Sequence, residues 1–341
     1  MSEHDSQPEQ MPPSAQLMQY IFPGGIAAQA IYTATKLRIA EVLAEKQKTA
    51  EELAQATGCD GRSLYRLLCA LTSLGIFEKT STGAFGNSPL SDLLRRDISG
   101  SMGAWTLFLA APFNWKLWGN LEETVRFGTP AAGRVYGKSF WEYLAENPAD
   151  AEVFNGAMSA GSQMSASAIV SGYDFSVFKK IVDVGGGHGT LLYAILSSAP
   201  QVAGILYDLP EVVANADILR SGALAGRVEI IGGSFFDGVP PADAYILQGV
   251  IHDWDDSDAI AILKNCRRSI SGGGKLLICT SILKSTGEPD RRSFMDIYMM
   301  LYGGRERTEE ELRAILAESG FSLKRVIPTS MQAFILESEP A

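Results

Sequence analysis

Histidine, cysteine and clustered basic residues are scarce in this 341-residue chain, and each scarcity excludes a class of site. Only three histidines are present, and the four cysteines show no CxxC spacing, so no zinc or other metal centre is predicted. Lysine and arginine number 29 against 39 acidic residues, for a formal net charge of −10. A nucleic-acid surface needs clustered Lys and Arg, and this balance therefore argues against nucleic acid as a partner.

Long apolar runs are also missing. The most apolar stretch, WTLFLAAPFNW, is far too short to span a bilayer, so no membrane partner is expected. The opening residues are polar, acidic and contain proline, which predicts a disordered tail over residues 1–15 and not a signal peptide. Hydrophobic residues make up 46% of the chain, as in soluble globular proteins, and a cytoplasmic location is the expectation.

Residues 16–98 are predicted to form a helical domain that ends in a small hairpin. TAEELAQATG opens with a capping box, Thr49 with Glu52, and DGRSLYRLLCALTSLG places leucines on one helical face. IFEKTSTGAFGNS is typical of two short strands around a turn. Helix, turn, helix and hairpin together indicate a winged helix. Because this segment is not basic, an interaction surface is favoured over DNA binding.

Residues 99–341 are predicted to form a second domain, in which residues 99–175 are bridging helices rich in aromatic side chains. Such side chains usually form core, although some are able to wall a pocket for a flat apolar ligand. From residue 176, apolar runs alternate with helical segments. This predicts an α/β fold, a doubly wound Rossmann-like sheet with helices on both faces. FSLKRVIPT and MQAFILESE are expected to add an antiparallel C-terminal hairpin.

The stretch VDVGGGHGTLLYAIL combines a strand, a glycine turn and a helix, which is the arrangement of a cofactor site. Gly185, Gly186 and Gly187 let the backbone approach a ligand, and the helix that follows offers free N–H groups to a negative group. Asp208 ends the next strand, where a carboxylate accepts hydrogen bonds from ribose hydroxyls. The spacing departs from G-x-G-x-x-G, which favours S-adenosylmethionine and leaves a nicotinamide dinucleotide as the alternative.

His252 in QGVIHDWDDSD follows the fourth strand of the sheet, at the carboxyl edge where ligands bind. Three nearby acids have a structural explanation: Asp255, Asp256 and Asp258. Acidic residues stabilise a helix N-terminus, and a helix with an apolar face that ends at Ile270 is expected to follow them. His252 lies between strand and helix and has no such explanation. Since imidazole titrates near neutrality, we interpret His252 as a catalytic residue.

Five motifs in order, VDVGGGHG, YDLP, GVIHDWDD, GGGKLLI and GGRERTEEEL, make the chain resemble one class of S-adenosylmethionine-dependent O-methyltransferases. This class includes the plant caffeate and animal acetylserotonin enzymes. The resemblance runs from about residue 20 to the C-terminus. It implies methyl transfer to a hydroxyl of a small aromatic or polyketide-like natural product, with S-adenosyl-L-methionine as cofactor. It also implies that the N-terminal winged helix mediates a homodimer.

The resemblance further implies roles for particular residues. His252 would be the general base that takes the proton from the substrate hydroxyl, and Glu306 in GGRERTEEEL would orient it and stabilise its charged form. The residues expected to line the cofactor are Gly185, Gly186, Gly187, Asp208, Ser234, Phe235, Gln248 and Ser162. The residues expected to line the acceptor pocket are Met158, Asn155 and Met299.

Three positions depart from the family pattern. Ser234 replaces an acid in GGSFF, and Gln248 and Gly249 stand where a lysine or arginine is common. Thr280 replaces a second glutamate of the catalytic site. This last change leaves an alternative open, in which the fold binds the cofactor for hydroxylation or pericyclic chemistry. Because His252 and Glu306 are both present, methyl transfer is favoured.

Overall fold

The structure, a computed structural model, describes residues 11–220, 222–224, 226–285, 289–330 and 333–341. The chain forms two compact units, Met1–Asn114 and Trp115–Ala341. The expected disordered tail falls mostly on residues 1–10, which lie outside the described residues. Among the described residues, no helix combines the length and the apolar character needed to cross a membrane.

The first unit consists of short helices and one small hairpin. Its elements are α1 (Pro13–Ile21), α2 (Pro23–Lys36), α3 (Ile39–Val42), α4 (Ala50–Thr57), α5 (Gly61–Ser73), β1 (Phe77–Lys79), β2 (Phe85–Asn87), α6 (Pro89–Asp92) and α7 (Gly103–Leu109), followed by α8 (Pro112–Trp118) at the division between the units. Helix α7 packs against α2. The division between the two compact units therefore lies beyond residue 98. The domain boundary that the sequence suggests at residue 98 stays a prediction.

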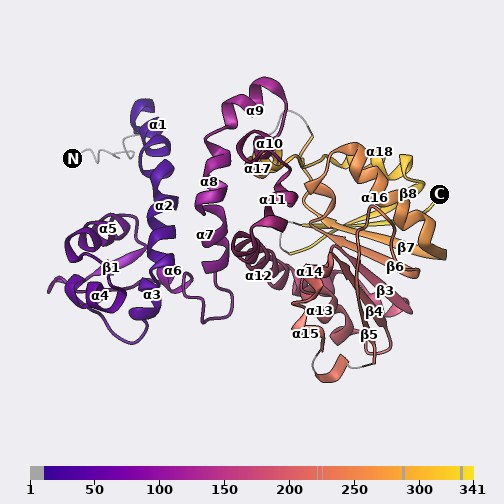
Figure 1. Cartoon of the computed structure of the whole chain (residues 1–341), viewed down its shortest axis with the longest axis horizontal. Helices are drawn as coiled ribbons and strands as arrows, with labels where there is room; N and C mark the ends of the chain where they lie inside the picture. The colour runs from indigo at the N-terminus through magenta and orange to yellow at the C-terminus, as the bar shows by residue number, and fades with distance from the viewer. Residues whose placement is uncertain (1–10, 221, 225, 286–288, 331–332) are drawn as a thin grey trace, which may run out of the picture. The chain divides into compact units, whose positions relative to one another are not determined.

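The predicted helix, turn, helix and hairpin are all present in the first unit. Thr49 and Glu52 form a reciprocal capping box at the start of α4. The helix ends at Gly58, whose φ of 69° only glycine adopts readily. Leucines at helical spacing on α5 are buried, and β1 pairs antiparallel with β2. Local sequence signals thus determine this part of the fold, shown in indigo and purple in Figure 1.

The second unit is an α/β sheet preceded by helices. Its elements are α9 (Leu121–Phe127), α10 (Ala131–Tyr136), α11 (Phe140–Glu146), α12 (Pro148–Gly172), η1 (Phe175–Val177), β3 (Lys180–Val184), α13 (Thr190–Ser198), β4 (Ala203–Asp208), α14 (Pro210–Val213), α15 (Asp217–Arg220), η2 (Gly222–Leu224), β5 (Val228–Gly232), β6 (Ala242–Gln248), η3 (Ile251–Asp253), α16 (Asp256–Ser269), β7 (Ile270–Thr280), α17 (Ser293–Tyr302), α18 (Glu309–Glu318), β8 (Phe321–Pro328) and β9 (Phe334–Pro340).

Seven strands form one mixed sheet in the order β5-β4-β3-β6-β7-β9-β8. The first five in this order pair in parallel, and β9 pairs antiparallel with both β7 and β8. The C-terminal hairpin is therefore confirmed, with β9 inserted between β7 and the edge strand β8. The doubly wound sheet with an antiparallel ending, preceded by a helical domain, is confirmed as well.

Each face of the sheet carries its own hydrophobic core. One core joins alternate residues of β3, β6 and β7 to helices α12 and α13, and the other joins the intervening residues to α16 and α18. Successive side chains of a strand point to opposite faces, so strands that are apolar throughout serve both cores. Figure 1 shows the strands between these two helical layers.

One element boundary differs from its prediction. Ile270 was expected to close the apolar face of the helix that begins near Asp256, but α16 ends at Ser269 and Ile270 is the first residue of β7. The strand therefore begins before the glycines of SGGGK. β7 pairs with β6 at Ile270 as well as beyond the glycines, with an irregularity between the two registers. Pairing across the sheet thus overrides the local glycine signal.

Candidate active site

The order of the parallel strands reverses between β3 and β6, which are neighbours in the sheet. From β3 the chain continues to β4 and β5 on one side, and from β6 it continues to β7 on the other. In doubly wound sheets, ligands bind beyond the carboxyl ends of the strands at such a reversal. Gly185 follows β3 and Gly249 follows β6, so the turns after these two strands both begin at the reversal.

The turn after β3 has a backbone conformation that favours glycine. Gly185 and Gly187 have φ values of 67° and 59°. A Cβ at Gly185 would lie 2.7 Å from the Val250 side chain, whereas the space around Gly187 is open. The Gly187 N–H donates a hydrogen bond of 2.8 Å to Asp208 Oδ2. The structure thus brings together the glycine turn and the acid that the sequence singled out.

Asp208 is held at the end of β4 by two backbone donors. Besides Gly187, the Leu209 N–H donates to its Oδ1 at 2.7 Å. Burial raises the pKa of Asp208, while these two hydrogen bonds lower it and limit the rise. Each carboxylate oxygen has a second lone pair for a hydroxyl donor. The geometry suits a carboxylate that accepts from a ligand's hydroxyl groups.

His188 within the same turn carries an unpaired polar atom. Its Nδ1 lies 3.1 Å from Ser159 Oγ on α12. Its Nε2 is buried and has no hydrogen-bond partner among the described residues. Burial lowers the pKa of His188, so the ring is neutral near pH 7. Since buried polar atoms are normally paired, Nε2 marks a place for a polar atom of a ligand.

The other residues expected beside a cofactor lie around the same turn. The ring of Phe235 lies 3.6 Å from the position of a Cβ on Gly185. Ser234 precedes it, and its Oγ accepts from the Phe236 N–H at 3.2 Å. Gln248 ends β6, and its Nε2 donates to Ser165 Oγ on α12 at 2.6 Å.

Helix α12 carries three further expected residues, all partly buried: Asn155, Met158 and Ser162. The hydrogen bonds from this helix to the glycine turn and to β6 come from Ser159 and Ser165. Met299, the third residue expected to line the acceptor pocket, is buried on α17. This helix packs against the η3 turn that holds His252.

His252 and Glu306 lie side by side although they are far apart in the sequence. His252 Nδ1 is 2.9 Å from Glu306 Oε1. The His252 side chain is 24% exposed, and that of Glu306 is 2% exposed. The other carboxylate oxygen of Glu306 accepts a hydrogen bond from Ser281 Oγ. With Nδ1–H donating to the carboxylate, the lone pair of the neutral ring is on Nε2, which lies beside Gly249.

Two carboxylates act on the charge of His252. Burial alone would lower the pKa of His252, but the charge of Asp253 and the hydrogen bond and charge of Glu306 outweigh it and raise the pKa to about 9. Asp253 Oδ1 lies 3.6 Å from Nε2. Burial raises the pKa of Asp253 to about 6, against the opposing charge of His252. The imidazole is therefore a strong base that faces acids on both sides.

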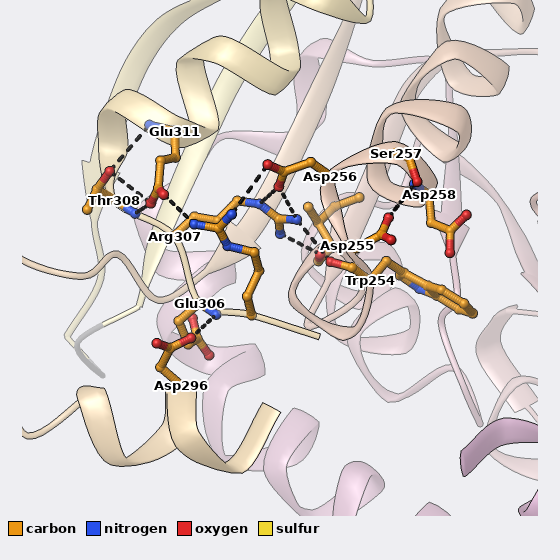
Figure 2. Close-up of polar contacts among 12 residues, drawn as sticks. Trp254, Asp255, Asp256, Ser257, Asp258, Asp296, Glu306, Arg307, Thr308 and Glu311 are labelled. Carbon is orange, nitrogen blue, oxygen red and sulfur yellow. Dashed lines mark hydrogen bonds and ion pairs between the residues drawn. The ribbon is translucent and has the colours of Figure 1, made fainter. Parts of the chain in front are cut away.

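The acids that follow His252 stabilise the start of α16, as the sequence suggested. Asp255 is the N-cap, and its Oδ1 accepts from the Asp258 N–H at 2.9 Å. Asp256 forms an ion pair of 2.8 Å with Arg307 (Figure 2). Among the described residues, no group of three or more His, Cys, Asp or Glu is arranged to hold a metal ion.

Comparison with known proteins identifies the family of this chain. Residues 118–322 match the O-methyltransferase domain, and residues 18–97 match the O-methyltransferase dimerisation domain. The chain belongs to this O-methyltransferase family. The predicted activity class, an S-adenosylmethionine-dependent O-methyltransferase, is thereby confirmed.

Relatives of this methyltransferase match it over nearly their whole length. A phenazine O-methyltransferase of Lysobacter antibioticus is 39% identical over 333 residues, which are 97% of each chain. The crystal structure of LaPhzM has a TM-score of 0.93 at 39% identity, covering 97% of this chain and 100% of that one. An O-methyltransferase from neocarzinostatin biosynthesis, in complex with S-adenosylmethionine and 2-hydroxy-5-methyl naphthoic acid, has a TM-score of 0.82 at 33% identity, covering 92% and 96%.

The residues around the glycine turn of the methyltransferase fit S-adenosylmethionine. The cofactor has ribose hydroxyls, from which Asp208 is placed to accept hydrogen bonds. It also has an α-carboxylate and an amino group, which need polar partners such as the unpaired Nε2 of His188. The open space at Gly187 admits a ligand against the backbone. The chemistry of the donor set therefore agrees with the cofactor.

Sequence reasoning assigned no role to four polar residues of the site: Asp253, Ser281, Asp296 and Arg307. Asp296 Oδ1 accepts from the Glu306 N–H at 2.9 Å, and Arg307 is buried beside Glu306. Two of the four are sequence neighbours of the proposed catalytic pair, which is the one signal that pointed to them. The fold brings in the other two, Ser281 from just after β7 and Asp296 from α17.

Proposed function

We propose that this methyltransferase methylates a hydroxyl of a small aromatic or polyketide-like natural product, with His252 as the general base. The 2.9 Å contact between His252 Nδ1 and Glu306 Oε1 carries the proposal. The acceptor class is supported by the relatives, whose names and titles record a phenazine and a hydroxynaphthoic acid, both planar and fused-ring.

The chemistry requires a proton to leave the acceptor hydroxyl. S-adenosylmethionine, when bound, supplies a methyl group already activated on a sulfonium. In our proposal, His252 Nε2 takes the hydroxyl proton as the oxygen attacks, and Glu306 fixes the tautomer and stabilises the imidazolium that forms. Holding the oxygen in line with the methyl group supplies much of the acceleration, on the order of several kcal/mol.

We assign the remaining expected residues to two groups. The residues proposed to line the cofactor are Gly185, Gly186, Gly187, Asp208, Ser234, Phe235, Gln248 and Ser162. The residues proposed to line the acceptor pocket are Met158, Asn155 and Met299. Asp253 lies 3.6 Å from His252 Nε2, and Ser281 donates to Glu306. These polar contacts on the pair support methyl transfer despite the change at Thr280.

The test is an incubation with methyl-labelled S-adenosylmethionine and a panel of hydroxylated phenazines, naphthoates and simple phenols, together with their amino analogues. We expect labelled methyl ether and S-adenosylhomocysteine in equal amounts with at least one fused-ring acceptor. A product altered by hydroxylation or a pericyclic step, with no label transferred, would support the non-methylating alternative. N-methylation of an amino analogue without any O-methylation would refute the hydroxyl acceptor.

We further propose that the protein is a homodimer through its N-terminal unit. The match to a dimerisation domain supports this assembly. Large apolar side chains on and beside α1 and α2 are exposed in the single chain, among them Tyr20 at 79% and Phe22 at 64%. Exposed apolar patches of this kind are typical of protein–protein interfaces.

A further inference from the structure

Arg307 is a buried cation next to Glu306, and its side chain is 1% exposed. A buried guanidinium needs partners for its N–H groups, because an unpaired buried charge is strongly unfavourable. Among the described residues, the hydrogen-bond partners of this guanidinium lie within residues 251–256. Nη1 donates to the Ile251 carbonyl at 2.9 Å, and Nη2 donates to the Trp254 carbonyl at 2.9 Å. Nε and Nη2 both donate to Asp256 Oδ1, at 2.9 and 2.8 Å (Figure 2).

The segment that the Arg307 guanidinium binds also carries His252. Ile251 precedes the histidine, and Trp254 and Asp256 follow it, so the guanidinium contacts the backbone on both sides of it. Arg307 is itself anchored, because the Leu283 N–H donates to its carbonyl at 3.0 Å. A fork of fixed planar geometry is suited to this task, since it binds several acceptors at defined angles.

The segment before Arg307 also lies directly on the histidine backbone. The Arg305 N–H donates to the His252 carbonyl at 2.8 Å. A Cβ at Gly304 would lie 2.1 Å from the same carbonyl oxygen, so only glycine permits this approach. Residues 304–307 thus hold His252 in two complementary ways, with the Glu306 carboxylate on the ring and Arg307 on the flanking backbone.

The charge of Arg307 also acts on the pKa values of His252 and Glu306. It lowers the pKa of His252, as a weaker effect than those of burial and the two carboxylates, and it helps to lower the pKa of Glu306. Two effects of Arg307 are therefore separable by substitution. Lysine keeps the charge and loses the fork, whereas methionine loses both.

We propose that Arg307 is a positioning residue for methyl transfer, which fixes the loop of residues 251–256 so that the His252 ring stays hydrogen-bonded to Glu306. This inference rests on the proposed role of His252 as the general base. Arg307 does not contact the reacting atoms in this account. It acts through the backbone that presents the imidazole.

The experiment compares Arg307→Lys and Arg307→Met with the wild type. The control is Arg313→Met, which removes the same charge from an exposed arginine on α18 that pairs with Glu309. For both Arg307 variants we expect kcat to fall on the order of a hundredfold, the cost of misplacing a reacting group by about 1 Å, with cofactor affinity within threefold of wild type. The midpoint of the pH profile should rise only in Arg307→Met, because only there is the charge lost. Arg313→Met should match the wild type in all three measurements.

A spectroscopic readout separates positioning from plain stability. With only three histidines in the chain, nitrogen NMR of the labelled imidazoles is readily assigned. The hydrogen-bonded Nδ1–H signal of His252 should broaden or disappear in the folded Arg307 variants. A kcat within twofold of wild type with this signal intact would overturn the proposal, as would a loss of kcat that only tracks the folded fraction. Should Arg307→Met not fold, Arg307→Lys decides by the same criteria.

His252→Ala, measured in parallel, keeps the two proposals distinguishable. If this variant retains wild-type turnover, the base assignment fails whatever the Arg307 variants do. If it is inactive while the Arg307 variants turn over normally, only the positioning inference fails.

Discussion

At the scale of single residues, the imidazole of His252 determines how activity depends on pH. The pKa of His252 is raised to about 9 against an ordinary 6.5, so the ring is mostly protonated at pH 7. A general base acts in its unprotonated form. With a hydroxyl acceptor that stays un-ionised over the range, we expect kcat/KM to rise about tenfold per pH unit below the midpoint and to level off above about pH 9.

Glu306→Gln tests the source of that raised pKa. In the native protein, the negative charge of Glu306 and its hydrogen bond with Nδ1 both raise the pKa of His252. The substitution removes the charge and weakens the hydrogen bond. We therefore expect the midpoint of the pH profile to move to lower pH and the plateau to fall. Asp253 remains and offsets part of the lowering that burial causes. A midpoint that does not move would mean that Glu306 does not act on the titrating group.

Residues of the site differ in how far the sequence could reveal them. Asp208 was predictable because a local rule places an acid at the end of the strand after a glycine turn, and the Gly187–Asp208 hydrogen bond agrees with it. Arg307 was not predictable, because an arginine among the glutamates of GGRERTEEEL has the composition of an exposed face. Its burial results from packing between segments far apart in the sequence. Ser281 is hidden for the same reason.

At the scale of elements, the start of α18 supports the segment that carries Glu306 and Arg307. Thr308 and Glu311 form a capping box, in which the Thr308 N–H donates to Glu311 Oε2 at 2.8 Å and Thr308 Oγ1 accepts from the Glu311 N–H at 3.3 Å (Figure 2). The N-cap residue is the direct neighbour of Arg307. The helix therefore fixes one end of the segment that touches His252.

Thr308→Ala should loosen this end of the segment. Loss of an N-cap hydroxyl costs about 1 kcal/mol of helix stability. We expect faster amide hydrogen exchange in the first turn of α18, with exchange in α16 unchanged. Thr49→Ala removes the equivalent cap of α4 in the first unit and is the matched control, since it should leave α18 unchanged. Equal exchange at α18 in Thr308→Ala and wild type would show that the cap does not hold this helix.

Elements were predictable where a short pattern determines them. The capping box and leucine spacing of α4 and α5 follow from local preferences, and so does the alternation of β3, β4 and β5 with helices. The extension of β7 back to Ile270 follows instead from pairing with β6, which no window of sequence contains. The same holds for the insertion of β9 between β7 and β8.

At the scale of the whole molecule, the proposed homodimer gives the exposed apolar residues of α1 and α2 a role. We expect wild-type protein to have about twice the 36.7 kDa chain mass by light scattering. Tyr20→Glu should shift it toward the monomer, because a charge in an apolar interface remains unpaired. The control, Val177→Glu, changes an apolar residue of the second unit that is 62% exposed, and it should leave the mass unchanged. A wild-type monomer, or a dimer that tolerates Tyr20→Glu, would contradict this assembly.

Methyl transfer as we propose it requires that the acceptor hydroxyl lose its proton to His252. The most direct measurement is the rate of methyl transfer by His252→Ala, saturated with labelled cofactor, as a function of pH. We expect a rate lower by at least about a hundredfold, the usual contribution of a general base, with near wild-type cofactor affinity and no inflection near pH 9. Methyl transfer at the wild-type rate, or an unchanged inflection in this variant, would show that another group removes the proton.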